Sequence, residues 1–304
     1  MCKVVQYLLL VIVVGSFPYQ EVAAQYPNAE ETIFKPIRYF ADSLFTGTDT
    51  IFSAERMQAA IREKGELSIP SVDLKVTKGA KLKASSLYEK GISGVGLVAM
   101  CTKPNPLRAV HVNPASAFQI SADGLWVTNY HVLHAYAQSA EAVGRSAFLI
   151  RTVDGDILQL KAVVGFSAHD DIAIIQVEAR EKTSGVLPLA ESDPLIGDDV
   201  FVLGNPQGLL YSMTKGMVSN KYSDRIGLPG ERTGVLRNLL SITAEFAIGA
   251  SGSPVLNERG QVIGVVSSTQ VIEQNNIGRP QSQMVIRNVI PVSSLKKLLN
   301  IESK

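Results

Sequence analysis

The chain has 304 residues, of which 46% are hydrophobic, so it can bury a substantial core in one large domain or two small ones. Its 29 basic and 28 acidic residues give a formal net charge of +1. This balance gives no reason to expect nucleic acid or a strongly acidic surface as a partner.

Residues 1–24 have the features of a secretory signal peptide. Lys3 supplies a basic start, and the apolar run of residues 8–14 is too short to span a bilayer. Small residues at Val22-Ala23-Ala24 suit signal peptidase, so we expect cleavage after Ala24 and export to the periplasm or the medium. The less favoured alternative is an uncleaved anchor. No later segment predicts a membrane span, so none is expected after cleavage.

The chain has two cysteines, Cys2 and Cys101. Cleavage would remove Cys2, which leaves one thiol and no internal disulfide, so the fold would depend on packing rather than on crosslinks. Cys101 ends the apolar run of residues 96–101. We therefore interpret it as a small core residue rather than a reactive thiol.

Residues 25–84 form an N-terminal extension that is predicted to be partly helical. A first helix is indicated by apolar residues at helical spacing, namely Ile33, Ile37, Phe40 and Leu44. Ser53 can cap a second helix, which would carry Met57, Ala60 and Ile61 and end near Gly65. A lysine-rich polar connector follows. The extension carries no catalytic motif, and it is interpreted as a propeptide, a docking arm or an oligomerisation element.

From about residue 92 the pattern changes to short strands separated by turns. The candidates are rich in Val, Ile, Thr and aromatic residues: Gly94–Cys101, Ala117–Ser121, Leu125–Asn129, Ser146–Thr152, Ile157–Gly165, Ile172–Val177, Val200–Leu203, Tyr211–Ser219, Leu239–Ala244, Ser253–Leu256, Val262–Ser267 and Met284–Arg287. This pattern predicts an all-β fold of antiparallel barrels or sandwiches. The polar segment 178–184 would cross between two halves, and Pro291–Asn300 would form a closing helix.

Ser251 lies in a turn of small residues, Gly249-Ala250-Ser251-Gly252-Ser253-Pro254. A serine held in such a turn is a candidate nucleophile, and the backbone N–H groups of Gly249 and Ser251 can form an oxyanion hole. The plainer interpretation is an ordinary glycine-rich turn. The choice depends on a base and an orienting acid elsewhere in the chain.

A serine hydroxyl needs a base, which is usually a histidine. Among the four histidines, His131 lies just after a predicted strand, where an imidazole can face a cleft. The orienting carboxylate has two candidates, Asp170 and Asp171, at the start of an apolar strand. Because side chains alternate along a strand, we expect one carboxylate to face the cleft and the other to face solvent.

The order His131, then the aspartate pair, then Ser251 is that of the chymotrypsin arrangement. In that arrangement two six-stranded antiparallel barrels share the site. The first barrel, here about residues 85–180, supplies the base and the acid. The second, here about residues 195–290, supplies the nucleophile.

Four segments resemble the trypsin-like serine proteases of the bacterial HtrA (Deg) type. Residues 117–132 (AFQISADGLWVTNYHV) resemble the family pattern G-F-I-I-S-x-D-G-x-I-V-T-N-x-H-V, and residues 170–177 (DDIAIIQV) resemble its D-I-A-x-x-x-V strand. Residues 203–208 resemble its G-N-P-x-G loop, and residues 249–254 its G-N-S-G-G-P turn. The resemblance covers about residues 85–300 and places the aspartate of the family on Asp171 rather than Asp170.

Three departures from the family pattern bear on function. Ala250 replaces the asparagine of the HtrA turn, and also the aspartate with which digestive trypsins bind a freed N-terminus. Ser253 replaces a glycine, as in glutamyl endopeptidases, but no histidine follows His169, so glutamate specificity is not expected. The chain ends soon after the predicted closing helix, so no PDZ domain is expected.

The resemblance implies a chymotrypsin-like double β-barrel and a serine endopeptidase. In that mechanism Ser251 attacks the scissile carbonyl, His131 transfers the proton, and Asp171 orients His131. The segment Val266-Ser267-Ser268-Thr269 would pair with the backbone of protein or unfolded polypeptide substrates. No metal or cofactor is needed, and a homo-trimer through the N-terminal extension is an expectation from the family. Glu245, six residues before Ser251, raises a preference for basic residues, although its direction cannot be read from sequence.

Three rival interpretations remain. The first is a catalytically weak or inactive peptide-binding module. Ala250 in the oxyanion turn favours it, but the complete triad argues against it, because a binding role does not require all three residues. A lipase or esterase is disfavoured, because those enzymes use G-x-S-x-G with the partners following the serine. His131 and His134 have H-x-x-H spacing, but no cysteine or glutamate motif completes a metal site.

Overall fold

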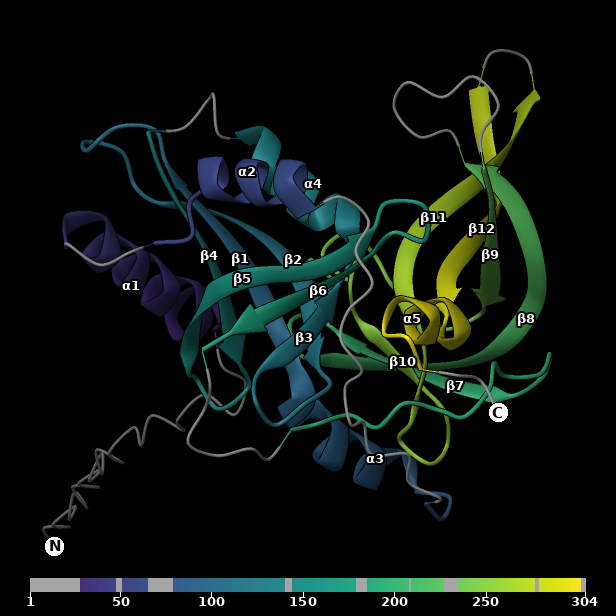
Figure 1. Cartoon of the computed structure of the whole chain (residues 1–304). Helices are drawn as coiled ribbons and strands as arrows, with labels where there is room; N and C mark the ends of the chain where they lie inside the picture. Colours follow the sequence, from purple (N-terminus) through teal and green to yellow (C-terminus); the bar gives the residue numbers. More distant parts are fainter. Residues whose placement is uncertain are drawn as a thin grey trace, which may run out of the picture.

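The computed structural model describes residues 28–47, 51–64, 79–139, 144–178, 185–207, 209–226, 235–276 and 279–301. The expected signal peptide, Cys2 and the helix end at Gly65 lie outside these ranges. Within them, two β-barrels stand side by side with helices on their outer surfaces (Figure 1).

The first barrel is closed in the order β1-β2-β3-β6-β5-β4 and is antiparallel throughout. Its strands are β1 (Val95–Lys103), β2 (His111–Gln119), β3 (Leu125–Thr128), β4 (Arg145–Thr152), β5 (Ile157–Ser167) and β6 (Ile172–Val177). Strand β1 requires a glycine at position 96, where it passes close to the buried side chains of Trp126 and Ile150. A Cβ there would lie 2.7 Å from Trp126 Cζ3 and 2.4 Å from Ile150 Cγ2. The absent side chain lets the buried indole pack directly on the strand.

The second barrel is closed in the order β10-β11-β12-β9-β8-β7. Its strands are β7 (Asp199–Gly204), β8 (Ser212–Ile226), β9 (Val235–Ile242), β10 (Pro254–Leu256), β11 (Val262–Asn276) and β12 (Arg279–Pro291). The expectation of an all-β fold with two six-stranded barrels is therefore confirmed.

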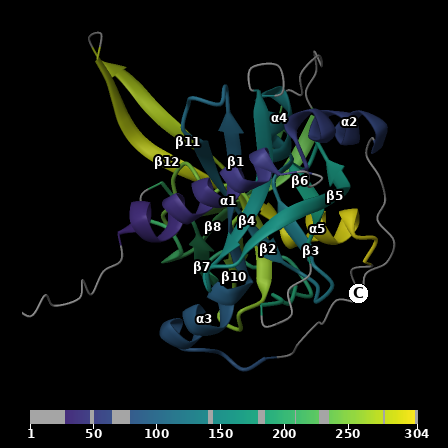
Figure 2. The ribbon, with the colours of Figure 1, turned by 90° about the vertical axis from the view of Figure 1, so that its left-hand side faces the viewer.

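Strands β11 and β12 are longer than the sequence predicted. Each continues past the barrel, and Val271, Ile272 and Glu273 pair with Val285, Met284 and Ser282. The two strands form a hairpin that projects from the second barrel (Figures 1 and 2). The sequence prediction ended β11 at Ser267 because the residues that follow are mostly polar and carry a weak strand signal.

The extension packs on the first barrel through its first two helices. A π-helical turn (Glu30–Phe34) leads into α1 (Lys35–Thr46), which buries Ile37 and Leu44 in the core cluster of the barrels. Helix α2 (Ala54–Lys64) begins with the predicted cap, because the Ser53 hydroxyl accepts a hydrogen bond of 3.3 Å from Arg56 N.

Helix α2 lies against α4 (Tyr130–Gln138) on the outside of the first barrel (Figure 1). The hydroxyl of Tyr136 on α4 donates to the carbonyl of Phe52, two residues before α2, at 3.1 Å. The extension therefore supports the helix that carries His131.

A third helix that the sequence did not predict, α3 (Ala84–Gly91), follows the expected polar connector and precedes the first barrel. Leu87 on α3 is buried, and the Tyr88 hydroxyl donates to the carbonyl of Tyr211 at 2.8 Å. This helix thereby joins the extension to the second barrel. After β12, helix α5 (Val292–Leu298) closes the chain, slightly shorter than the predicted Pro291–Asn300 because Pro291 is the last residue of β12.

Candidate active site

Asp171 lies immediately before β6 and accepts three kinds of hydrogen bond. Its Oδ1 receives the backbone N–H of His131 at 2.9 Å, and its Oδ2 is 2.9 Å from His131 Nδ1. The hydroxyl of Ser267 donates to Oδ2 at 2.8 Å. The backbone of Asp171 has φ +54°, which is uncommon for a residue with a side chain. Asn129 holds this conformation by donating from Nδ2 to the Asp171 carbonyl at 2.9 Å.

Asp170 points elsewhere, toward a second set of polar groups. One carboxylate oxygen is 3.1 Å from His169 Nδ1, and the other accepts the Ser167 hydroxyl at 3.4 Å. The expectation that this carboxylate would face solvent is wrong: Asp170 is 8% exposed, against 7% for Asp171. The first barrel and α5 enclose it, since Ser294 on α5 also donates to it at 3.4 Å. Of the two neighbouring carboxylates, Asp171 is the one that contacts His131.

A buried arginine lies near both carboxylates. Arg237 on β9 is 7% exposed, and its burial lowers the pKa of the guanidinium, while the charges of Asp171 and Asp170 act in the opposite direction. Asp170 and Asp171 are therefore buried close to a positive charge, Arg237, that the second barrel supplies.

His131 is the second residue of α4, and its side chain is 47% exposed. The contact with Asp171 engages Nδ1, so Nε2 points away from the carboxylate. No hydrogen bond joins Nε2 to Ser251 Oγ among the residues that the structure describes. The Ser251 hydroxyl donates instead to the carbonyl of Ser267, over a long 3.5 Å.

The turn that carries Ser251 depends on two glycines with positive φ, Gly249 at +95° and Gly252 at +85°. A Cβ on Gly249 would lie 2.6 Å from the carbonyl oxygen of Asn205. The Ala250 N–H is used within the turn, where it donates to the Ala247 carbonyl at 3.0 Å. Within the described part of the chain, the N–H groups of Gly249 and Ser251 have no acceptor. The methyl group of Ala250 is fully buried.

The turn is fixed from both sides. Gly252 N–H donates to the carbonyl of Val266 on β11 at 3.1 Å. On the other side, the Gln207 N–H donates to the Ile248 carbonyl at 2.7 Å. Residue 207 belongs to the Gly-Asn-Pro loop after β7. Hydrogen bonds from this loop and to β11 therefore hold the nucleophile turn in place from both sides.

The four residues predicted to bind substrate have different surroundings. The main chain of Val266 is already paired with Gly252 and Ser253, and Ser267 is only 5% exposed, with its hydroxyl on Asp171. Ser268 and Thr269 are exposed. Sequence reasoning missed the contact between Ser267 and Asp171, because no local signal relates two residues 96 positions apart.

Glu245 forms an ion pair with Arg287 on β12. Its carboxylate is therefore already engaged, which speaks against the preference for basic residues that its position suggests. Cys101 is fully buried, and burial raises the pKa of its thiol to about 12. His134 stacks on the ring of Tyr130, with 5.6 Å between centroids. The described residues contain no group of three potential metal ligands.

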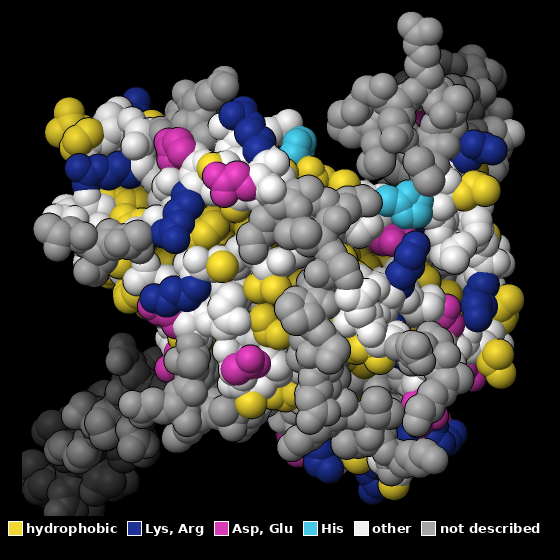
Figure 3. Space-filling model, viewed as in Figure 1, with side chains coloured by type: hydrophobic (Ala, Val, Ile, Leu, Met, Phe, Trp, Pro, Cys, Tyr) yellow, Lys and Arg dark blue, Asp and Glu magenta, His cyan; other side chains and the backbone are white. Residues whose placement is uncertain are grey.

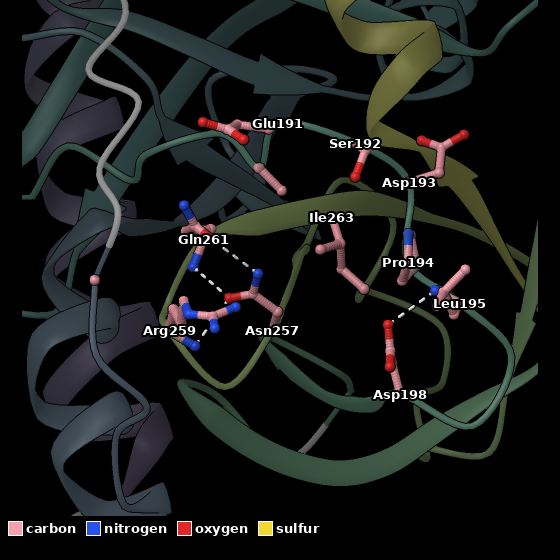
Figure 4. A pocket seen from close by; sticks show the side chains of 12 residues that line it. Glu191, Ser192, Asp193, Pro194, Leu195, Asp198, Asn257, Arg259, Gln261 and Ile263 are labelled. Carbon is pink, nitrogen blue, oxygen red and sulfur yellow. Dashed lines mark hydrogen bonds between the residues drawn. The ribbon is translucent and has the colours of Figure 1, made fainter. Parts of the chain in front are cut away.

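A pocket of about 600 Å³ lies outside this site, between the segment that leads to β7 and the turn from β10 to β11 (Figure 4). Its polar side chains serve local structure: Asp198 accepts the Leu195 N–H at 2.8 Å, and Asn257 Nδ2 donates to Gln261 Oε1 at 2.9 Å. Over the face in Figure 3, basic and acidic side chains are interspersed. No helix within the described ranges is both long and apolar enough to cross a membrane.

Comparison with known proteins agrees with this architecture. Residues 115–265 match the family model of the trypsin-like peptidase domain. The crystal structure of Deg5 superposes with a TM-score of 0.53 over 71% of this chain and 94% of that chain, and its 22% identity supports the fold alone. The class that the barrels and this match define is the trypsin-like peptidases.

Two curated relatives are named as proteases of the Do or DegP type. "Protease Do-like 1, chloroplastic" of Arabidopsis thaliana is 31% identical over 152 residues, which is 49% of this chain and 32% of that protein. "Probable periplasmic serine endoprotease DegP-like" of Bartonella henselae is 31% identical over 184 residues, 60% of this chain and 32% of that protein. The chain thus spans about a third of the length of these curated relatives. The chain has the fold of a trypsin-like peptidase and is similar in sequence to serine proteases of the HtrA type.

Proposed function

We propose that the protein is a serine endopeptidase that cleaves polypeptides through Ser251, His131 and Asp171. The observation that carries this proposal is the pairing of Asp171 with His131 Nδ1 at 2.9 Å, next to a turn that presents Ser251. This pairing holds the imidazole with its proton on Nδ1, so Nε2 is available to accept the proton of the nucleophile.

Catalysis begins when the Ser251 hydroxyl leaves the Ser267 carbonyl and turns toward His131. The 3.5 Å contact that it gives up is long, so little stabilisation is lost. Ser251 Oγ attacks the scissile carbonyl as His131 Nε2 takes its proton. The imidazolium then returns this proton to the leaving amine, and water hydrolyses the acyl-enzyme by the same route in reverse.

The oxyanion of each tetrahedral intermediate is stabilised by the N–H groups of Gly249 and Ser251. These donors have no other acceptor in the described residues, while Ala250 N–H is occupied at 3.0 Å by Ala247. Losing one donor of this kind typically costs about 100- to 1000-fold in rate. An extended substrate chain would add to the exposed edge of β11 at Ser268 and Thr269.

The natural setting follows from the same family relationship. We expect polypeptide substrates and export to the periplasm or the medium, because a DegP-like relative is named as periplasmic. A homo-trimer through the N-terminal extension stays a prediction, and the molar mass of the purified protein in solution decides it.

The test compares two serines of one turn. Ser251→Ala should abolish proteolysis of a denatured protein and labelling by a fluorophosphonate probe. Ser253→Ala should retain both, because the Ser253 hydroxyl is buried without a hydrogen-bond partner. Cleavage by the Ser251→Ala variant at the wild-type rate would reject the proposal.

A further inference from the structure

An ion pair that the proposed reaction does not use lies beside the nucleophile turn. Arg287 Nη2 on β12 donates to Glu245 Oε2. The side chain of Arg287 is 15% exposed, whereas that of Glu245 is 72% exposed. The cation is thus largely buried, while the carboxylate that neutralises it remains at the surface.

The position of this pair is set by two features of the proposed site. Glu245 belongs to the segment that leads into the oxyanion turn, four residues before Gly249. Arg287 is the cross-strand partner of Thr269 on the β11 edge. Consider a substrate whose scissile carbonyl lies at Ser251 and whose backbone pairs with Ser268 and Thr269. The side chain of its residue before the scissile bond then points between the Glu245 segment and β12, which carries Arg287.

The chemistry of the pair favours one kind of side chain there. A largely buried guanidinium needs a carboxylate beside it, because an unpaired buried charge is costly. Glu245 contacts only Nη2, and Nε is buried without a hydrogen-bond partner. A second carboxylate that binds across Nε and Nη2 would satisfy the free donor in the bidentate geometry that arginine favours. Glu245, mostly exposed, can return to water at little cost.

We propose that Arg287 is a specificity-determining residue that selects Asp or Glu immediately before the scissile bond. Glu245 holds the guanidinium in the free enzyme and is displaced by the substrate carboxylate. A lysine in the same place would meet a buried cation and a carboxylate that is already paired. The inference rests on the proposed function, and it reverses two sequence-based expectations: the doubt about glutamate specificity and the basic-residue preference raised for Glu245.

The kinetic test uses peptides that differ only in Glu, Gln or Lys before one scissile bond. The ratio of kcat/KM for Glu over Gln is measured on a single preparation, so it does not depend on the folded fraction. We expect the wild type to prefer Glu, and Glu245→Gln to raise the ratio about tenfold because the internal competitor is lost. Arg287→Met should bring the ratio to about one, and Arg287→Lys should keep part of it.

Two kinetic outcomes would overturn the inference. One is a wild-type preference for Lys over Gln, and the other is a Glu-to-Gln ratio that Glu245→Gln leaves unchanged or lowers. Glu245→Gln keeps the size of an exposed side chain and an oxygen that can accept from Arg287 Nη2, so it decides the matter even if Arg287→Met does not fold.

A binding measurement separates this inference from the proposed function. Labelled peptides that end in Glu or Gln are titrated against the Ser251→Ala variant by fluorescence anisotropy, which requires no turnover. We expect tighter binding of the peptide ending in Glu, and loss of the difference when Arg287→Met is added. If the wild type cleaves no peptide, the proposed function fails, and this comparison still decides the role of Arg287. Equal affinities would reject it.

Discussion

The hydroxyl of Ser267 donates a hydrogen bond of 2.8 Å to Oδ2 of Asp171, so the second barrel holds the acid that the first barrel supplies. The same oxygen is 2.9 Å from His131 Nδ1. Because the carboxylate receives donors from both barrels, its orientation depends on how the barrels sit against each other. The carbonyl of Ser267 also accepts the Ser251 hydroxyl, so this one residue links the acid and the nucleophile.

Replacing Ser267 by alanine should lower kcat without unfolding the protein. The change removes one donor to a buried carboxylate, and hydrogen bonds to charged groups contribute about 1.5–3 kcal/mol, so we expect roughly a 10- to 100-fold loss. Peptide kinetics with active-site titration measure it. Ser294→Ala is the matched control, since its hydroxyl donates to Asp170 at 3.4 Å and it should retain near wild-type kcat. Equal losses in both variants would contradict the role assigned to Ser267.

The neighbouring carboxylates should differ sharply in kinetic effect. Asp171→Asn would leave the wrong tautomer at His131, and in the Ser-His-Asp template this exchange lowers kcat by about 10⁴. Asp170→Asn should change kcat only a few-fold, because Asp170 contacts Ser167, His169 and Ser294 rather than His131. Single-turnover cleavage of an ester substrate compares them. A larger loss of kcat in Asp170→Asn than in Asp171→Asn would mean that Asp170, and not Asp171, orients His131.

Two glycines with the same backbone conformation test the oxyanion turn. Gly249 and Gly197 have φ of +95° and +94°. A Cβ on Gly249 would lie 2.6 Å from the Asn205 carbonyl oxygen, whereas one on Gly197 meets nothing within 4 Å. Both alanine variants should lose about 1–2 kcal/mol from the strained backbone, but only Gly249→Ala should also lose most of its activity. Urea unfolding and kcat, measured together, separate the effects, and an active Gly249→Ala variant would place the oxyanion elsewhere.

The sequence predicted the parts of the site that depend on local pattern. Twelve strands follow from alternation and turn residues, and the histidine, aspartate and serine each lie in a recognisable segment. Contacts between distant segments could not be predicted. Nothing near Ser267 indicates that its hydroxyl reaches Asp171, and nothing near Glu245 indicates Arg287. Asp170 was expected in solvent because strand alternation takes no account of α5, which packs over it.

Helix α3 and the long hairpin were missed for a related reason. The segment Ala84–Gly91 is short and polar, and it becomes helical where Leu87 and Tyr88 can pack against the second barrel. Strand β11 continues through polar residues because each finds a partner on β12. In both cases tertiary contacts outweigh weak local preference.

Stability at alkaline pH should report the buried thiol of Cys101. Its pKa is raised from 9.0 to about 12 by burial, so above pH 9 the unfolded chain loses a proton that the folded chain keeps. The free energy of unfolding should therefore fall between pH 9 and pH 12, by up to about 1.4 kcal/mol per pH unit from this group. Tyr211 titrates over part of the same range, with a pKa raised to about 12.

The contribution of Cys101 is isolated by comparison with Cys101→Ala. Urea unfolding at pH 8 and pH 10.5 should show a smaller decrease for the variant than for the wild type, whatever Tyr211 contributes to both. Identical decreases in the two proteins would mean that the thiol ionises as easily in the folded state as in the unfolded chain.

Helix α1 should be required for the stability of the first barrel. Ile37 is fully buried in the core cluster, so Ile37→Ala should cost about 2–5 kcal/mol of unfolding free energy, as for other large buried aliphatic side chains. Ile33 is only partly buried against the same cluster, and Ile33→Ala is the control with a smaller cost. Urea denaturation of both variants measures the difference. If the two changes cost the same, or if a protein that starts at residue 85 is as stable as the whole chain, the extension is a removable segment and not part of the folded domain.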